Sequence, residues 1–169
     1  MNRQGGAVKV KDLMIPIHDF LRPDVTLKEA VNLLHIARRD AEKQGVKGLP
    51  VLDDHYKLIG ILSMRDILKA VYPSYMSMMN LGNFTWDGML ESLAKRAGAE
   101  KVAAHMSRDL WTVQENDSLM ECVDLMIKHD IKRLPVLDQS GKVVGMIYER
   151  DVFNTITNAM FDDRPEGKK

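Results

Sequence analysis

The chain has 169 residues, of which 45% are hydrophobic and 28% are charged, and its 24 basic and 24 acidic residues give a net charge of zero. This balance excludes the strong basic field with which proteins attract nucleic acid or anionic membranes. The single cysteine, Cys122, excludes an internal disulfide, and no apolar run reaches membrane-spanning length. We therefore expect a cytoplasmic protein with neither a nucleic-acid nor a membrane partner.

The first predicted helix recurs later in the chain. Capping-box patterns begin at Thr26 and at Ser118, where a hydroxyl and a glutamate three residues later satisfy the free amides of a helix start. Each pattern opens a segment with apolar residues at i, i+3, i+4 and i+7, which predicts an amphipathic helix. Cys122 aligns with Ala30 on the apolar face. We expect it to be a buried small side chain rather than a reactive thiol.

Each predicted helix is followed by two short strands and a second helix. Residues 48–68 read GLPVLDDHYKLIGILSMRDIL and residues 133–153 read RLPVLDQSGKVVGMIYERDVF, with 9 identities at 21 aligned positions. The apolar runs predict strands, the polar residues between them predict a hairpin turn, and Ser63 or Tyr148 opens the last helix. With a short extended segment near residues 20–21 or 112–113, each unit is predicted to be β-α-β-β-α.

The spacing between the two copies changes along the chain. The strands are offset by 85 residues (133 − 48) and the preceding helices by 92 (118 − 26), so the first copy carries seven extra residues within 34–47. Their polar, helix-forming character predicts about two more helical turns. An internal repeat of this kind predicts two half-domains that share one core.

A segment with many apolar residues, 72–101, separates the two copies. It contains Met76, Met78, Met79, Leu81, Phe84, Trp86, Met89, Leu90 and Leu93. These are too many apolar groups for a solvated linker, so we expect the segment to fold, mainly as helix, and to pack on the module or on a second subunit. Methionines on such a segment either fill gaps in the core or bind a partner. The predicted domains are 8–71, a helical insert at 72–101, and 102–160.

The combined pattern resembles the CBS domain, which is named after cystathionine-β-synthase. The shared features are a Met-ended first segment, a capped helix, an L-P-V-hydrophobic-D strand, a G-hydrophobic-hydrophobic strand and a final R-D. Because the pattern occurs twice over about residues 8–160, the chain resembles a tandem CBS pair, or Bateman module, with no catalytic domain outside it. The resemblance implies an α/β fold whose repeats pack about a pseudo-two-fold axis.

The resemblance also implies a function. Tandem CBS pairs commonly regulate or sense, without catalysis and without a required cofactor, and their clefts bind an adenosine-containing ligand: AMP, ADP, ATP, S-adenosylmethionine or NAD. Such modules often form homodimers and act on a regulated partner protein. The competing hypothesis is a ligand-independent dimeric interaction scaffold that uses the Met-rich insert. The five histidines show no metal-ligand spacing, and no nucleophile–base pair suggests an enzyme.

The family pattern assigns the ligand site to the end of the last strand. There, a hydroxyl residue lies near the ribose or phosphate, and an aspartate three residues later binds the ribose diol. Ser63 and Asp66 match this pattern, whereas the second copy keeps Asp151 but has Tyr148 in place of the hydroxyl residue. A carboxylate can accept hydrogen bonds from two vicinal hydroxyls. The alternative for the first copy is a helix cap that binds no ligand.

The resemblance places the phosphate partners just before the L-P-V strand of the opposite repeat. The second copy offers Lys132 and Arg133 there, and the first offers Lys47 and Gly48. Two unequal clefts are therefore expected, and the stronger one combines Asp66 with Arg133, because arginine forms strong charge-assisted bonds to phosphate. The adenine base is expected between residues 15–20 and 107–113. The alternative for the basic residues is a solvated pair at a strand edge.

Overall fold

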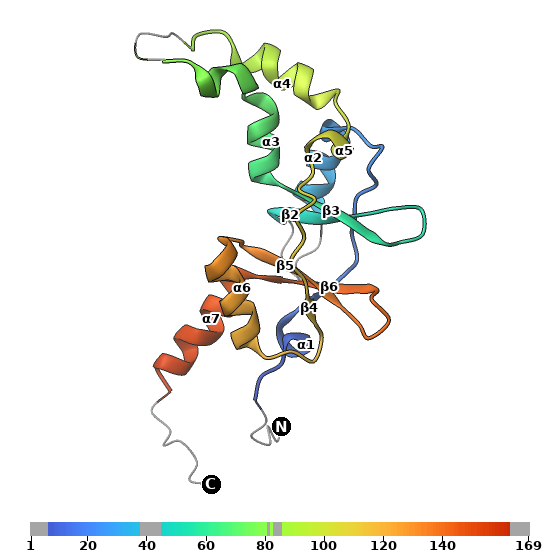
Figure 1. Cartoon of the computed structure of the whole chain (residues 1–169), viewed down its shortest axis with the longest axis vertical. Coiled ribbons are helices and arrows are strands. Elements are labelled where there is room, and N and C mark those ends of the chain that lie inside the picture. The colour runs from blue at the N-terminus through green and yellow to red at the C-terminus, as the bar shows by residue number, and fades with distance from the viewer. Residues whose placement is uncertain (1–6, 38–44, 81, 83–85, 163–169) are drawn as a thin grey trace. The chain divides into compact units, whose positions relative to one another are not determined.

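The structure is a computed structural model of the chain, and it describes residues 7–37, 45–80, 82 and 86–162. The chain forms two compact units (Figure 1). One contains the described residues up to Ile17 and those from Trp111 onward, and the other is His18–Leu110. Each unit therefore combines most of one sequence repeat with the first segment of the other repeat.

The unit His18–Leu110 is built around one hairpin. Its elements are α2 (Leu27–Ile36), β2 (Gly48–Leu52), β3 (Leu58–Ser63), α3 (Met64–Val71), the 3-10 helix η1 (Ser74–Met78), α4 (Leu90–Gly98) and α5 (Val102–His105). Strands β2 and β3 are antiparallel. An isolated bridge extends each edge of the hairpin: Leu21 pairs in parallel with Val51, and Ser107 pairs antiparallel with Ile61.

The other unit has the same arrangement with longer pairing. Its elements are α1 (Val10–Leu13), β1 (Ile15–Pro16), β4 (Val113–Gln114), α6 (Leu119–His129), β5 (Arg133–Leu137), β6 (Val143–Tyr148) and α7 (Glu149–Met160). The sheet order is β1-β6-β5-β4, with β4 and β5 parallel. Val113 pairs with Val136 and Ile15 pairs with Met146, at the positions equivalent to the two bridges of the first unit. Both units therefore follow one pairing scheme.

The predicted helices begin where the capping patterns place them. The Thr26 hydroxyl oxygen accepts a hydrogen bond from the Glu29 amide at 3.2 Å, and the Ser118 hydroxyl oxygen accepts one from the Met120 amide at 3.1 Å. The apolar faces point into two cores, one in each unit, whereas the repeat predicted a single shared core. Cys122 is fully buried, as predicted. The last helix, α7, begins directly after Tyr148, as predicted, and ends at Met160.

The extra residues of the first copy lie near the end of helix α2. Helix α2 ends at Ile36, and the returning chain bonds to this end: the amide of Val46 donates to the carbonyl of Leu34 at 3.0 Å, and the amide of Gly45 donates to the carbonyl of the C-cap residue Ala37 at 2.9 Å. The predicted two further helical turns fall largely on residues 38–44, which lie outside the described residues, so they stay a prediction.

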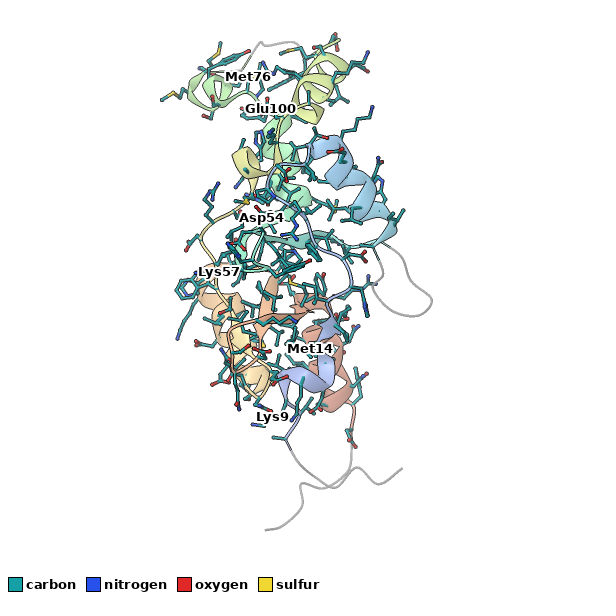
Figure 2. The ribbon with its side chains drawn as sticks, turned by 90° about the vertical axis from the view of Figure 1, so that its right-hand side faces the viewer. Lys9, Met14, Asp54, Lys57, Met76 and Glu100 are labelled. Atoms are coloured by element: carbon teal, nitrogen blue, oxygen red, sulfur yellow. The ribbon has the colours of Figure 1, made fainter. Side chains whose placement is uncertain are left out.

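The described part of the insert contains η1 and α4, joined by turns and irregular segments. Helix α4 packs against α3 and α2, and Met76 of η1, which is labelled in Figure 2, is only 1% exposed. Met78 and Met79, in contrast, are 90% and 50% exposed. The insert thus contributes one methionine to the interior and presents others at the surface. No helix in the described part of the chain is long and apolar enough to cross a membrane.

One aspartate shapes each hairpin turn. The Asp53 carboxylate accepts hydrogen bonds from the amides of His55 and Lys57, both at 2.9 Å, and Figure 2 labels Lys57 in this turn. The Asp138 carboxylate accepts one from the Ser140 hydroxyl at 2.6 Å. The Lys57 amide is the main cause of a lowered pKa at Asp53, and the Ser140 hydroxyl is the main cause at Asp138. The aspartate of the L-P-V-hydrophobic-D motif is therefore explained by turn geometry.

Candidate functional site

Ser63 and Asp66 lie where β3 ends and α3 begins, and each is only 6% exposed. The amide and the hydroxyl of Ser63 donate to one carboxylate oxygen of Asp66, Oδ2, at 2.8 and 2.7 Å. The Asp66 amide donates back to the Ser63 hydroxyl at 3.4 Å. These bonds form a capping box, so Ser63 and Asp66 cap helix α3, as the alternative interpretation of this motif predicts.

The other carboxylate oxygen of Asp66, Oδ1, has a different partner. The Ser107 hydroxyl donates to it at 3.1 Å. Ser107 follows α5 and is paired with β3, because its amide and carbonyl form backbone hydrogen bonds to Ile61 at 2.9 and 3.0 Å. Residues 107–113 were expected beside the adenine base, but the contact of Ser107 with Asp66 was not predicted, although Ser107 is a hydroxyl residue directly after the methionine that both repeats share. We define Ser63, Asp66 and Ser107 as the first half-site.

Gly60 in β3 allows the segment that contains Met106 and Ser107 to lie close against the strand. A Cβ atom at Gly60 would lie 2.6 Å from Sδ of Met106 and 3.2 Å from the carbonyl oxygen of Ser107. In the other unit, a Cβ atom at Gly145 would lie 2.8 Å from Sδ of Met14, which Figure 2 labels in the N-terminal segment. The glycine of the motif is therefore required because the Met-ended segment packs directly on the strand backbone.

The equivalent positions of the other unit carry different chemistry. Tyr148, half-buried, is the N-cap of α7 and makes no side-chain cap hydrogen bond, and Asp151 follows in the first turn. Arg133 lies directly opposite Tyr148 in the β5–β6 ladder, where the first unit has Gly48. Ile15 pairs with β6 at the position that corresponds to Ser107 of the first half-site. We define Ile15, Arg133, Tyr148 and Asp151 as the second half-site.

The structure places Arg133 in the same unit as Tyr148. Lys132 and Lys47 have exposed side chains, and their carbonyls accept hydrogen bonds from the first amide of the helix after each hairpin, at 2.9 and 3.0 Å. The expected contact of Lys132 and Arg133 with a ligand on Asp66 would join residues of different units. It stays a prediction, as do the contacts of Lys47 in the other cleft and the base position between residues 15–20 and 107–113.

Two further observations limit the chemistry outside the half-sites. Burial raises the pKa of the Cys122 thiol to about 11, so the thiol is protonated at neutral pH and is a poor nucleophile. Among the residues that the structure describes, no group of three or more His, Cys, Asp or Glu side chains is placed to hold a metal ion.

Comparison with known proteins supports the repeat found in the sequence. The model of the CBS domain matches residues 10–73 and again residues 100–158. Protein MJ1426 of Methanocaldococcus jannaschii is 28% identical over 153 residues, which cover 83% of this chain and 90% of that protein. The chloroplastic CBS domain-containing protein CBSX2 of Arabidopsis thaliana is 28% identical over 158 residues, which cover 88% of this chain and 63% of that protein.

The chain corresponds to only a part of some relatives. It is 26% identical over 150 residues to the inosine-5'-monophosphate dehydrogenase of Methanocaldococcus jannaschii, and this match covers 89% of the chain but 23% of the enzyme. The chain therefore spans most of MJ1426, slightly less than two thirds of CBSX2 and about a quarter of the dehydrogenase.

Solved structures agree with the fold. The crystal structure of the CBS-pair protein CBSX2 from Arabidopsis thaliana has a TM-score of 0.64 at 25% identity, with 92% of this chain and 98% of that chain covered. The CBS-domain containing protein ATU1752 from Agrobacterium tumefaciens has a TM-score of 0.67 at 23% identity, with the same coverage of 92% and 98%. This chain belongs to the CBS domain family and contains two copies of the domain in tandem.

Proposed function

We propose that this chain is a regulatory module that binds an adenosine nucleotide at Asp66 and passes the binding state to a partner protein. The observation that carries the proposal is the unequal use of the Asp66 carboxylate. Oδ2 accepts two buried bonds from Ser63, while Oδ1 accepts one part-buried bond from Ser107 within the described residues. The single bond to Oδ1 is the more exposed one, so Oδ1 is the carboxylate oxygen that a ribose hydroxyl can reach by taking the place of the Ser107 hydroxyl.

The choice of ligand has support from a related protein. One crystal structure shows CBSX2 in complex with AMP. That structure matches the present chain with a TM-score of 0.63 at 24% sequence identity. AMP is therefore the first ligand to test, followed by ADP, ATP, S-adenosylmethionine and NAD. The proposal includes Lys132 and Arg133 as phosphate partners of the ligand on Asp66.

The proposal also includes a weaker second site. Tyr148 occupies the volume where the first half-site has a small hydroxyl, and Ile15 supplies no hydrogen bond from its side chain. Asp151 would hold the ribose of a second ligand, with Lys47 from the other repeat near its phosphate. We expect this site to bind weakly or to prefer a smaller ligand, because the bulkier Tyr148 and Ile15 replace the two serines of the first half-site.

Thermal unfolding with the ligand panel tests the proposal. A ligand present at 100 times its Kd adds about 2.7 kcal/mol to the stability of a folded state that alone binds it. For a chain of this size the expected rise in Tm is about 5–10 °C. Failure of all five ligands to raise the Tm at millimolar concentration would refute nucleotide binding.

Calorimetry with two variants assigns the site. Asp66→Asn keeps the shape of the side chain but removes the charge, and we expect AMP affinity to fall about tenfold or more, since hydrogen bonds to charged groups contribute about 1.5–3 kcal/mol. Glu29→Gln makes the same change in the exposed capping box of α2 and serves as the matched control. Equal affinities for the wild type and Asp66→Asn would remove Asp66 from the site.

A second candidate function is a ligand-independent interaction scaffold that acts as a homodimer in the cytoplasm. It has support from exposed apolar side chains: Met78 and Met79 in the insert, Leu68 on α3 and Phe153 on α7. Large exposed apolar groups on several helices favour association with another surface. Sedimentation at micromolar concentration should show a dimer, and a clean monomer would contradict this part of the proposal.

A further inference from the structure

The bond between Ser107 and Asp66 differs from the other bonds of the first half-site. Both Ser63 bonds to Oδ2 are buried and link residues three apart, whereas the Ser107 bond to Oδ1 is part-buried and links residues 41 apart. Ser107 is itself exposed, while Asp66 is 6% exposed. A molecule that approaches Asp66 from solvent therefore meets Oδ1 together with the Ser107 hydroxyl.

The backbone holds this hydroxyl in place. Two hydrogen bonds join Ser107 to Ile61, and the absent side chain of Gly60 lets Met106 and Ser107 lie against the strand. The side chain can leave Oδ1 by rotating about χ1, with no change in the backbone. Such a rotation costs little compared with breaking the strand pairing. The contact is thus preformed but easily exchanged.

We propose that the Ser107 hydroxyl occupies the position of a ribose hydroxyl on Asp66 and competes with the nucleotide for that position. The inference rests on the proposed function, since it concerns the same site. A ribose hydroxyl that donates to Oδ1 displaces the serine hydroxyl. The net gain in binding free energy is therefore the contribution of the ligand bond minus that of the internal bond. Ser107 therefore lowers the affinity of the site for the ribose diol. If Ser107 instead bonded to the ligand directly, it would raise that affinity.

The second half-site has no serine at the position equivalent to Ser107. Ile15 stands at the equivalent position, where its amide and carbonyl can pair with the strand but its side chain cannot donate a hydrogen bond. The serine competitor therefore belongs to the first half-site, where it would distinguish the ribose response of Asp66 from that of Asp151.

Calorimetric titration of the full chain with AMP and with 2′,3′-dideoxy-AMP tests the inference. Ser107→Ala should bind AMP about two- to tenfold more tightly than the wild type, since one net hydrogen bond no longer opposes binding. Its affinity for the dideoxy compound should stay unchanged, because that ligand has no ribose diol to compete. The control Ser77→Ala, which removes a hydroxyl bonded to a backbone carbonyl in η1, should match the wild type with both ligands.

An isosteric pair protects the test against effects of shape. Ser107→Thr keeps the hydroxyl and Ser107→Val removes it at the same size, so the valine variant should bind AMP more tightly than the threonine variant. Weaker or equal AMP binding by the alanine and valine variants would overturn the inference while leaving the proposed function intact. An equal gain for AMP and the dideoxy compound would overturn it too. Absence of AMP binding by the wild type would refute the proposed function itself, and the inference with it.

Discussion

The replacement Asp66→Ala measures how much of the first half-site is structural. Alanine removes the bonds from the Ser63 amide at 2.8 Å, from the Ser63 hydroxyl at 2.7 Å and from the Ser107 hydroxyl at 3.1 Å. Ser63 is 6% exposed, so water does not readily replace the lost acceptor of its amide. A buried donor without an acceptor costs about 1–3 kcal/mol, and the part-buried Ser107 bond adds about 0.5–1 kcal/mol. We expect the free energy of unfolding to fall by about 2–3 kcal/mol.

The exposed capping box of α2 provides the comparison. There the Thr26 amide donates to the Glu29 carboxylate at 2.8 Å, and water can replace this bond in Glu29→Ala. We expect a loss of about 0.5–1 kcal/mol for Glu29→Ala in urea unfolding followed by circular dichroism. The reasoning is refuted if Asp66→Ala loses no more than Glu29→Ala, because burial would then contribute nothing. Since domains of this kind have about 5–15 kcal/mol of stability, Asp66→Ala should remain folded at 25 °C.

Two further predictions concern glycine packing and the buried thiol. Gly145→Ala should destabilise more than Gly60→Ala, by about 3 against 1–2 kcal/mol, because its Cβ would meet a backbone oxygen at 2.8 Å whereas the nearest atom at Gly60 belongs to a flexible methionine. Gly98→Ala, with its nearest atom at 3.7 Å, should lose nothing, and a reversed order of the first two would contradict the argument. Cys122 has a folded pKa of about 11 against an ordinary value of 9.0, so the unfolded chain releases this proton first and stability should decline as the pH rises from 9 to 11. Cys122→Ala should lose this part of the pH dependence, and identical profiles for both proteins would show that the thiol does not contribute.

The elements that follow from neighbouring residues could be predicted from the sequence. The caps at Thr26 and Ser118, the hairpins and the start of α3 depend on contacts within a few residues, and the structure has them at the predicted positions. The internal repeat supplied the architecture, since equivalent strands pair in equivalent register. Ser63 and Asp66 were also identified together, because their spacing is that of a short-range cap.

The features that depend on distant segments could not be predicted in the same way. Ser107 reaches Asp66 from 41 positions away, and no local pattern indicates that the start of the second repeat pairs with a strand of the first. The sequence also did not predict the bonds from the amides of Gly45 and Val46 to the end of α2. The pairing of Arg133 with Tyr148 in the β5–β6 ladder was not predicted either, and the expected contact of Arg133 with a ligand on Asp66 stays a prediction.

A crystal structure of the chain with bound AMP tests the central claim most directly. We predict a ribose hydroxyl within about 2.5–3.0 Å of Oδ1 of Asp66, with Ser63 still bonded to Oδ2 and the Ser107 hydroxyl turned away from the carboxylate. A complex in which AMP binds elsewhere, while Asp66 keeps its bonds to both serines, would contradict the claim.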